Sequence, residues 1–231
     1  MNGAVTYSHA SYNLYWQRAD GTGEVQRLTE SPNVQSPSSF DPSGKYLAFH
    51  EITPKNSNDL MILPIEGDEK SGWKPGKPSV FLSTPAAEIV PMFSPDGRWI
   101  AYFSNESGQY EVFVRPFPGP GGKWQISTAG GLETAWSRTR RELFYRALDN
   151  RIMVVSYTVE GDSFKADKPR LWSEQAISAR RPQSTPFDLH PDGERIAAAG
   201  PSVQPEEKLD KVTFIFNFFD ELRRIAPPAK K

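Results

Sequence analysis

Phe93-Ser-Pro-Asp-Gly-Arg-Trp-Ile-Ala-Tyr102 is the stretch of sequence that decides the fold. Proline presets the backbone of a turn, Asp accepts hydrogen bonds from its own backbone and Gly tolerates a positive φ, so Pro-Asp-Gly predicts a tight turn between two strands. Similar segments begin at Phe40, Trp136 and Leu189, and the four align on Pro42, Pro95, Arg138 and Pro191. The spacings are 53, 43 and 53 residues (95 − 42, 138 − 95 and 191 − 138). A unit of this size is typical of one propeller blade.

Further strand-like runs lie between these hairpins at regular places. A third strand is predicted at residues 13–16, 60–63, 110–114, 152–155 and 212–216, and a fourth at 25–29, 80–84, 124–128 and 170–172. The sequence therefore predicts an all-β protein, a β-propeller of four-stranded antiparallel blades. About five blades are expected, of which the first lacks its opening strand and the last its closing strand.

The remaining segments are expected to be connections within a single domain that spans residues 1–231. Residues 66–78 and 175–186 are polar and rich in Pro, Gly or Ser, which predicts two long loops, and residues 201–210 also indicate a loop. A short C-terminal helical turn is predicted at residues 220–225, where Pro227 and Pro228 would end it. Because the predicted first and last blades are partial, we expect the chain to be a fragment of a longer propeller.

Composition excludes several classes of function. With 27 Lys and Arg against 28 Asp and Glu, no global charge indicates a nucleic-acid partner. The absence of cysteine excludes disulfides, thiolate metal sites and a cysteine nucleophile. The longest apolar run, residues 212–219, is too short for a membrane span, and the sequence after Met1 has no features of a signal peptide.

The repeat resembles that of TolB-like propellers, also described as WD-like or PD-type repeats. The segments at residues 136–146, 152–155, 168–172, 187–195 and 216–225 resemble the C-terminal propellers of bacterial serine/threonine protein kinases. This resemblance implies a propeller that acts as a sensor and is extracytoplasmic in its parent protein. The chain departs from the pattern at Ser137-Arg-Thr-Arg140, which replaces Ser-Pro-Asp-Gly, and it contains none of the kinase motifs, so kinase activity is not implied.

Two candidate recognition elements stand out. Arg138, Arg140 and Arg141 form a basic cluster, and Arg suits carboxylate or phosphate ligands, although a solvated and charge-balanced surface is the favoured interpretation of the cluster. Trp73 lies in the predicted loop 66–78 among Lys residues, and an exposed loop aromatic is a typical recognition residue. The other five tryptophans fall in predicted strands and are expected to pack between blades.

No catalytic or metal-binding residues are predicted. His9, His50 and His190 belong to no metal-binding or catalytic motif, and no Gly-x-Ser-x-Gly pentapeptide occurs. The acidic segments 20–24 and 66–69 have only a weak resemblance to cation sites. We therefore expect no enzyme activity, no cofactor and no metal.

Three functional hypotheses remain open. The first is a non-enzymatic recognition module that binds a protein or a small molecule and serves as the sensor or interaction part of a larger protein. The second is a hydrolase or lyase with its site at the channel mouth, or the propeller of a prolyl-oligopeptidase-like hydrolase that lacks its catalytic domain. The third is a fragment without a function of its own, whose open blade edges would cause self-association.

Overall fold

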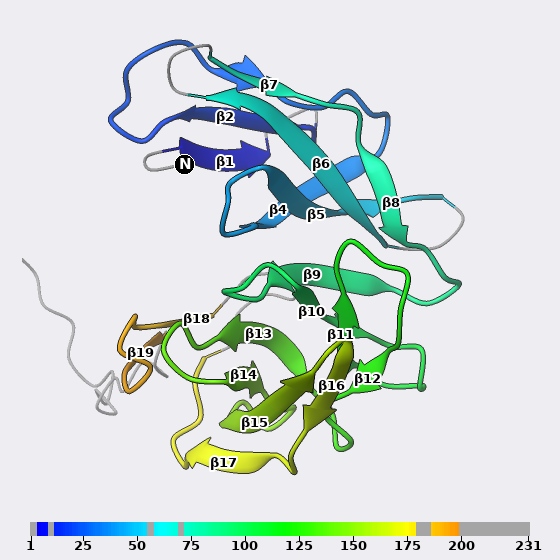
Figure 1. The fold of residues 1–231 in the computed structure, drawn as a ribbon, viewed down its shortest axis with the longest axis vertical. Coiled ribbons are helices and arrows are strands. Elements are labelled where there is room, and N and C mark those ends of the chain that lie inside the picture. Colours follow the sequence, from blue (N-terminus) through cyan, green and yellow to red (C-terminus); the bar gives the residue numbers. More distant parts are fainter. Residues whose placement is uncertain (1–3, 9–11, 55–57, 69–71, 179–185, 199–231) are drawn as a thin grey trace, which may run out of the picture. The chain divides into compact units, whose positions relative to one another are not determined.

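The described part of the protein consists of antiparallel β-sheets (Figure 1). The computed structural model describes residues 4–8, 12–54, 58–68, 72–178 and 186–198, and none of these residues is helical. The chain divides into two compact units, Met1–Pro201 and Ser202–Lys231. All strands of the described residues lie in the first unit. The predicted strand at 212–216 and the predicted helical turn at 220–225 lie outside the described residues. The single domain predicted over residues 1–231 stays a prediction.

The strands that the structure describes form five sheets, numbered here in chain order. Sheet 1 contains β1 (Ala4–Ser8), β2 (Leu14–Arg18) and β3 (Gln26–Arg27). Sheet 2 contains β4 (Val34–Phe40), β5 (Tyr46–Ile52), β6 (Asp59–Asp68), β7 (Gly72–Pro75) and β8 (Ser79–Leu82). Sheet 3 contains β9 (Glu88–Phe93), β10 (Trp99–Ser104), β11 (Glu111–Pro116) and β12 (Trp124–Gln125). Sheet 4 contains β13 (Leu132–Trp136), β14 (Glu142–Arg146), β15 (Ile152–Glu160), β16 (Ser163–Ala166) and β17 (Arg170–Ser173), and sheet 5 contains β18 (Phe187–Leu189) and β19 (Ile196–Ala198).

The four predicted turns each join the first two strands of a repeat. Asp41 shows why the sequence turns there: its carboxylate accepts hydrogen bonds from the backbone N–H of Ser43 (3.0 Å) and of Tyr46 (2.7 Å). Gly44, Gly97 and Gly193 follow with φ between 71° and 72°, a conformation that favours glycine. These observations confirm the predicted hairpins β4–β5, β9–β10 and β18–β19.

The divergent turn at residues 137–140 keeps its shape by another means. Ser137 Oγ accepts hydrogen bonds from the backbone N–H of Thr139 (3.4 Å) and Arg140 (3.1 Å), so a serine hydroxyl takes the place of the aspartate carboxylate. β13 and β14 still pair as an antiparallel hairpin. The loss of Pro-Asp-Gly therefore leaves the hairpin intact and frees the side chains at positions 138 and 140 for other contacts.

Each complete repeat carries one irregularity on its first strand. The register against the second strand shifts between Pro37 and Ser39 on β4, between Ile89 and Met92 on β9, and between Leu132 and Thr134 on β13. Such bulges bend a strand and change the direction of its side chains. At the bulge on β9, Val90 has a φ of 53°, which is strained for a β-branched residue. All three bulges precede the turn by four or five residues, so they recur with the repeat.

Sheets 2 and 4 contain an additional hairpin that sheet 3 lacks. Within the segment 66–78, predicted as a loop, residues 66–68 instead continue β6 and pair with β7 (Gly72–Pro75), and β15 and β16 form the equivalent hairpin in sheet 4. Trp73-Lys74-Pro75-Gly76-Lys77-Pro78 corresponds to Phe164-Lys165-Ala166-Asp167-Lys168-Pro169, 91 residues later (164 − 73). These hairpins explain the alternating spacings of 53, 43 and 53 residues.

Each additional hairpin packs against the preceding sheet. Trp73 on β7 meets Trp16 on β2 edge to face, with ring centroids 6.5 Å apart. Phe164 on β16 is 2% exposed and lies 5.2 Å from Trp99 and 6.0 Å from Trp124, both on sheet 3. Aromatic pairs of this geometry add to the energy of burial. The hairpins therefore join sheets 1 and 2, and sheets 3 and 4, into pairs.

An aromatic cluster also joins sheets 2 and 3. Phe117, which follows β11, lies 5.1 Å from Tyr46 and 4.9 Å from Phe93 between ring centroids.

The part of the chain that the structure describes contains no helix that is long and apolar enough to cross a membrane.

Candidate functional site

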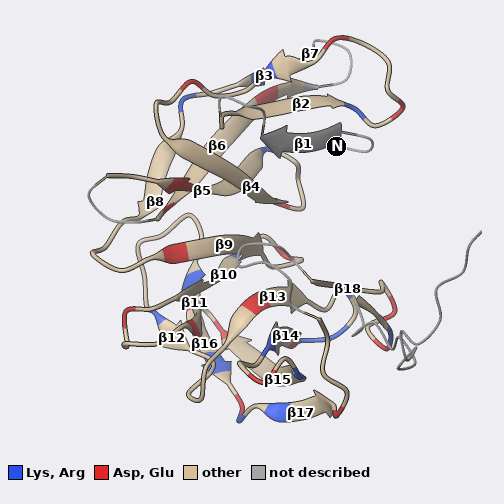
Figure 2. Ribbon diagram, turned by 180° about the vertical axis from the view of Figure 1, so that it is seen from behind, with Lys and Arg blue, Asp and Glu red and all other residues tan. Residues whose placement is uncertain are grey.

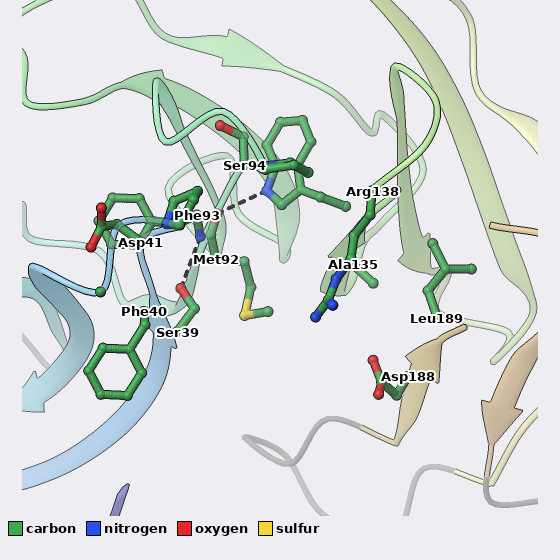
Figure 3. A pocket seen from close by; sticks show the side chains of 14 residues that line it. Ser39, Phe40, Asp41, Met92, Phe93, Ser94, Ala135, Arg138, Asp188 and Leu189 are labelled. Atoms are coloured by element: carbon green, nitrogen blue, oxygen red, sulfur yellow. Dashed lines mark hydrogen bonds between the residues drawn. The ribbon is translucent and has the colours of Figure 1, made fainter. Parts of the chain in front are cut away.

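An open cleft lies where the first strands of four consecutive sheets end (Figure 3). Its volume is about 670 Å³. The residues that line it come from the ends of β4, β9, β13 and β18 and from the turns that follow: Ser39, Phe40, Asp41, Pro42, Gly44, Met92, Phe93, Ser94, Pro95, Ala135, Trp136, Arg138, Asp188 and Leu189. Four repeats thus contribute equivalent segments to one site.

Two positions of the repeat differ in chemistry from sheet to sheet at this cleft. Three residues before the aligned turn position, the repeats carry Ser39, Met92, Ala135 and Asp188. At the aligned position itself, Pro42 and Pro95 line the cleft in two repeats, and Arg138 replaces proline in the third. A hydroxyl, a thioether, a methyl group, a carboxylate and a guanidinium are therefore presented by one recurring backbone.

The position two residues before the aligned turn position carries a large apolar side chain in all four repeats. Phe40, Phe93, Trp136 and Leu189 occupy it, and their side chains pack in the apolar clusters between sheets. Burial of these side chains fixes the strand ends on which the variable residues stand. Repeated packing therefore supports a rigid frame for the cleft.

Most polar groups that line the cleft are already engaged within the fold. Ser39 Oγ donates to the carbonyl of Pro91 (3.1 Å) and accepts from the N–H of Phe93 (2.9 Å). Ser94 Oγ donates to Asp96 and accepts from the N–H of Trp99. Trp136 Nε1 donates to the carbonyl of Met92 (2.9 Å), a bond between sheets 3 and 4 that Figure 3 shows. The bonds of Ser39 and Trp136 hold neighbouring first strands together, and those of Ser94 hold its own turn.

Arg138 and Asp188 are the exceptions. Neither side chain forms a hydrogen bond or an ion pair with any residue that the structure describes, and both are exposed. Figure 3 shows the guanidinium of Arg138 and the carboxylate of Asp188 directed toward the same opening. Asp41 differs, because both of its carboxylate oxygens accept hydrogen bonds within its own turn. Two opposite charges are therefore available to a ligand.

The three predicted arginines have separate environments. Arg138 lines the cleft. Arg140 donates to the carbonyl of Gly193 in sheet 5 and forms an ion pair with Glu142 (3.0 Å), so its guanidinium links two sheets. Arg141 is exposed and does not line the cleft. Of the predicted basic cluster, only Arg138 contributes to this site.

Trp73 does not have the environment that the sequence predicted. It lies in a strand rather than a loop, and its side chain is half-buried against Trp16 rather than exposed. The prediction of a loop was wrong because Gly, Lys and Pro at residues 70–78 dominate the composition and conceal the hairpin. A recognition role for Trp73 stays a prediction.

Asp188 was missed by sequence reasoning, although a signal for it exists. Aligning the four repeats on their turns places Asp188 in the same column as Ser39, Met92 and Ala135. Where the type of side chain at one aligned position changes between otherwise similar repeats, the fold does not require a particular residue at that position. The same comparison identifies Arg138, the residue at which the turn departs from proline.

The histidines and acidic segments do not form a second site. His50 is buried on β5 and neither ring nitrogen has a hydrogen-bond partner, whereas His190 pairs with Asp192 in an exposed turn (2.9 Å). His9 lies outside the described residues. A hydrogen bond from the side chain of Thr22 is the main cause that lowers the pKa of Asp20 to about 2. Among the described residues, no three His, Cys, Asp or Glu side chains form a group that could hold a metal ion.

A buried carboxyl with a perturbed pKa lies away from the cleft. Burial raises the pKa of Glu88, the first residue of β9, and its Oε2 has no hydrogen-bond partner. The cleft adjoins the opposite end of the same strand, at Met92 and Phe93. Glu88 therefore does not supply an acid or a base to the cleft.

Comparison with known proteins gives structural similarity without sequence similarity. No protein-family model matches the chain, and no curated protein matches it. TolB from Acinetobacter baumannii is similar with a TM-score of 0.59 and 17% identity over 87% of this chain and 48% of that chain. A puromycin-hydrolyzing peptidase of Mycobacterium tuberculosis gives a TM-score of 0.57 and 16% identity over 86% of this chain and 34% of that one. The β-propeller domain of Cps50 (Swd1) from Myceliophteria thermophila gives a TM-score of 0.53 and 11% identity over 84% of this chain and 62% of that chain.

At these identities the similarities show the fold alone. The described sheets are of the propeller class, as the repeat predicted. The chain spans between about a third and three fifths of the length of these solved structures. The peptidase and TolB share this fold but are named for different functions, so the fold does not determine the function. A function for this chain has to be argued from the residues of the cleft.

Proposed function

We propose that this protein is a non-enzymatic recognition module that binds its ligand in the cleft at the ends of β4, β9, β13 and β18. One observation carries the proposal: equivalent positions of four repeats meet there, and their side chains differ while the surrounding backbone recurs. Sites built on a rigid frame with variable side chains suit binding.

The dimensions and surroundings of the cleft favour a small ligand or a short chain segment. Its volume of about 670 Å³ lies within the range of roughly 300–1,000 Å³ that is common for ligand pockets. Charged residues of both signs are distributed over the described sheets (Figure 2), so recognition by a single-sign surface is not favoured. The cleft combines apolar walls with few available polar groups, which is the usual composition of such a site.

A thermal-shift screen with a cleft-filling variant tests the proposal. The probes are free amino acids, short peptides, mono- and disaccharides, nucleotides and fatty acids. Pro95→Trp should fill the cleft without unfolding the turn, because the equivalent position already carries Arg138. Pro191→Trp is the matched control, since Pro191 occupies the same repeat position and does not line the cleft.

We expect at least one probe class to raise the midpoint of thermal unfolding in the wild type and in Pro191→Trp but not in Pro95→Trp. At a probe concentration 100 times Kd the stabilisation is about 2.7 kcal/mol. This corresponds to roughly 5–10 °C for a chain of this size. No shift with any probe, or an equal shift in Pro95→Trp, would contradict binding in the cleft.

The absence of catalysis is part of the proposal. The cleft contains no histidine, and neither of its serines forms a hydrogen bond to a histidine among the described residues. We therefore expect no hydrolysis of p-nitrophenyl acetate or of alanyl-p-nitroanilide above the buffer rate. Turnover that Pro95→Trp abolishes and Pro191→Trp retains would favour the hydrolase alternative.

We further propose that the module is the sensing part of a longer protein, in keeping with the similarity to the propellers of bacterial kinases. Sequencing the DNA upstream of Met1 tests this. We expect an open frame that encodes further blades, a membrane span and a kinase domain. An in-frame stop codon immediately upstream would contradict the proposal.

A further inference from the structure

We propose that the ligand of this cleft is zwitterionic, with a carboxylate that pairs with Arg138 and an ammonium group that pairs with Asp188. An amino acid or a short peptide with free termini has this chemistry. The inference rests on the proposed function and names the ligand class of the same site.

The first step is an elimination among the polar side chains of the cleft. Ser39, Asp41, Ser94 and Trp136 use their polar atoms in bonds that hold the turns and the first strands together. A ligand would have to compete with those bonds. Arg138 and Asp188 have no partner among the described residues. One cation and one anion of the cleft therefore have no partner among the described residues.

The second step concerns the chemistry of Arg138. The guanidinium is planar and presents paired N–H donors that match the two oxygens of a carboxylate. In the two neighbouring repeats that line the cleft, the same position carries Pro42 and Pro95, which offer no side-chain donor. The departure at Arg138 thus adds a carboxylate receptor to this position of the cleft.

The third step concerns Asp188 on β18. Phe187 and Leu189 on either side of it are buried in the apolar cluster next to sheet 4, whereas Asp188 is exposed. Alternation along a strand directs Asp188 away from that cluster. Since a carboxylate accepts hydrogen bonds and attracts positive charge, an ammonium group is its natural partner.

The fourth step concerns the walls between the two charges. Met92 and Leu189 line the cleft and supply apolar surface without further charge. Methionine adapts its shape to different apolar groups. A ligand with charged ends and an apolar middle satisfies both the charges and the walls.

Isothermal titration with alanine, dialanine, trialanine and tetra-alanine tests the proposal. We expect one length to bind most tightly, because only one separation of the termini fits both Arg138 and Asp188. The N-acetyl and the C-terminal amide derivatives of that peptide should each bind about tenfold or more weakly, since each loses one charged contact. Equal affinity of the blocked and free peptides would overturn the proposal.

Charge-specific variants identify the residues. Arg138→Gln should weaken binding of the free peptide by about tenfold and leave the affinity for its C-terminal amide unchanged. Asp188→Asn should likewise weaken binding of the free peptide by about tenfold and leave the affinity for its N-acetyl derivative unchanged. Arg141→Gln and Glu160→Gln are the matched controls, because both residues are exposed and neither lines the cleft. A loss in the controls equal to that in the cleft variants would overturn the assignment.

Two kinds of failure are distinguishable. If Pro95→Trp abolishes the binding of neutral or singly charged probes and no zwitterion binds, the proposed ligand class is wrong, whereas the proposed binding in the cleft stands. If no probe of any class binds in a way that Pro95→Trp abolishes, the proposed function fails as well.

Discussion

His50 is buried on β5 with both ring nitrogens lacking hydrogen-bond partners. Burial lowers its pKa from 6.5 to about 4, because the apolar surroundings disfavour the charged imidazolium. The folded protein therefore holds this side chain neutral at a pH where the unfolded chain already binds a proton. The contribution of the neutral imidazole to the free energy of unfolding is fully present above the unfolded pKa of 6.5 and is lost as the pH falls toward 4.

We expect the wild type to lose up to about 3 kcal/mol more than His50→Leu when the pH falls from 7.5 to 4.5. Urea unfolding at both pH values measures the difference. A pH dependence that His50→Leu leaves unchanged would contradict a buried neutral histidine.

Arg146 and Glu133 form a buried ion pair, with side-chain exposures of 7% and 1%. The guanidinium makes two hydrogen bonds to the carboxylate, of 2.7 and 3.0 Å, and a third to Asn150 Oδ1. Glu133 is the additional residue at the bulge of β13. A buried pair with satisfied hydrogen bonds is costly to break from one side only.

We expect Glu133→Ala to destabilise the fold by about 3–5 kcal/mol, because it leaves the Arg146 charge buried without its carboxylate. The double variant Glu133→Leu with Arg146→Met should cost less than either single variant, since it removes both charges. A double-mutant cycle measured by urea unfolding checks this. Additive losses would show that the pair is not coupled.

At the scale of elements, the hairpins β6–β7 and β15–β16 each connect two neighbouring sheets. Phe164 is enclosed by Trp99, Trp124, Trp136 and Tyr157, whereas Trp73 is half-buried and pairs with Trp16. The two hairpins are equivalent in position and differ in burial. Their contributions to stability should differ accordingly.

We expect Phe164→Ala to cost about 3–5 kcal/mol, as is usual for a fully buried aromatic side chain. Trp73→Ala should cost less, about 1–2 kcal/mol, because part of its surface remains in water. Urea unfolding of both variants gives the comparison, and near-ultraviolet circular dichroism follows the tryptophans near Phe164. An equal or larger loss in Trp73→Ala would contradict the difference in burial.

Local sequence predicts those elements that a turn determines. The turns Asp41-Pro-Ser-Gly44, Pro95-Asp-Gly97 and Pro191-Asp-Gly193 located β4–β5, β9–β10 and β18–β19, because Asp, Pro and Gly each act within the turn itself. The hairpin β6–β7 was missed because Trp73 is held by Trp16, a contact 57 residues away in sequence (73 − 16). The cleft was predicted only at Arg138, since the meeting of four strand ends is a product of tertiary structure.

At the scale of the whole molecule, sheet 5 has an edge without a partner in the part of the chain that the structure describes. β19 pairs with β18 on one side only. Ala197 and Ala198 on β19 are exposed. Unpaired strand edges are sites of association between chains.

We expect the mass of the protein in light scattering to rise with concentration. Ala197→Lys should reduce this association, because a charged side chain on an edge strand opposes pairing. A mass that stays monomeric at all concentrations would contradict self-association.

The pairing of sheets by alternate hairpins also affects how such a chain can change by recombination. Loss of a single sheet would place a hairpin-bearing sheet beside another, or leave an aromatic side chain such as Trp99 without its cover. Loss or gain of two sheets, a step of 96 residues between aligned turn positions here (138 − 42), keeps every hairpin over its aromatic partner. We therefore expect related genes to differ in length by pairs of sheets, and a lineage that gains or loses single sheets would contradict this.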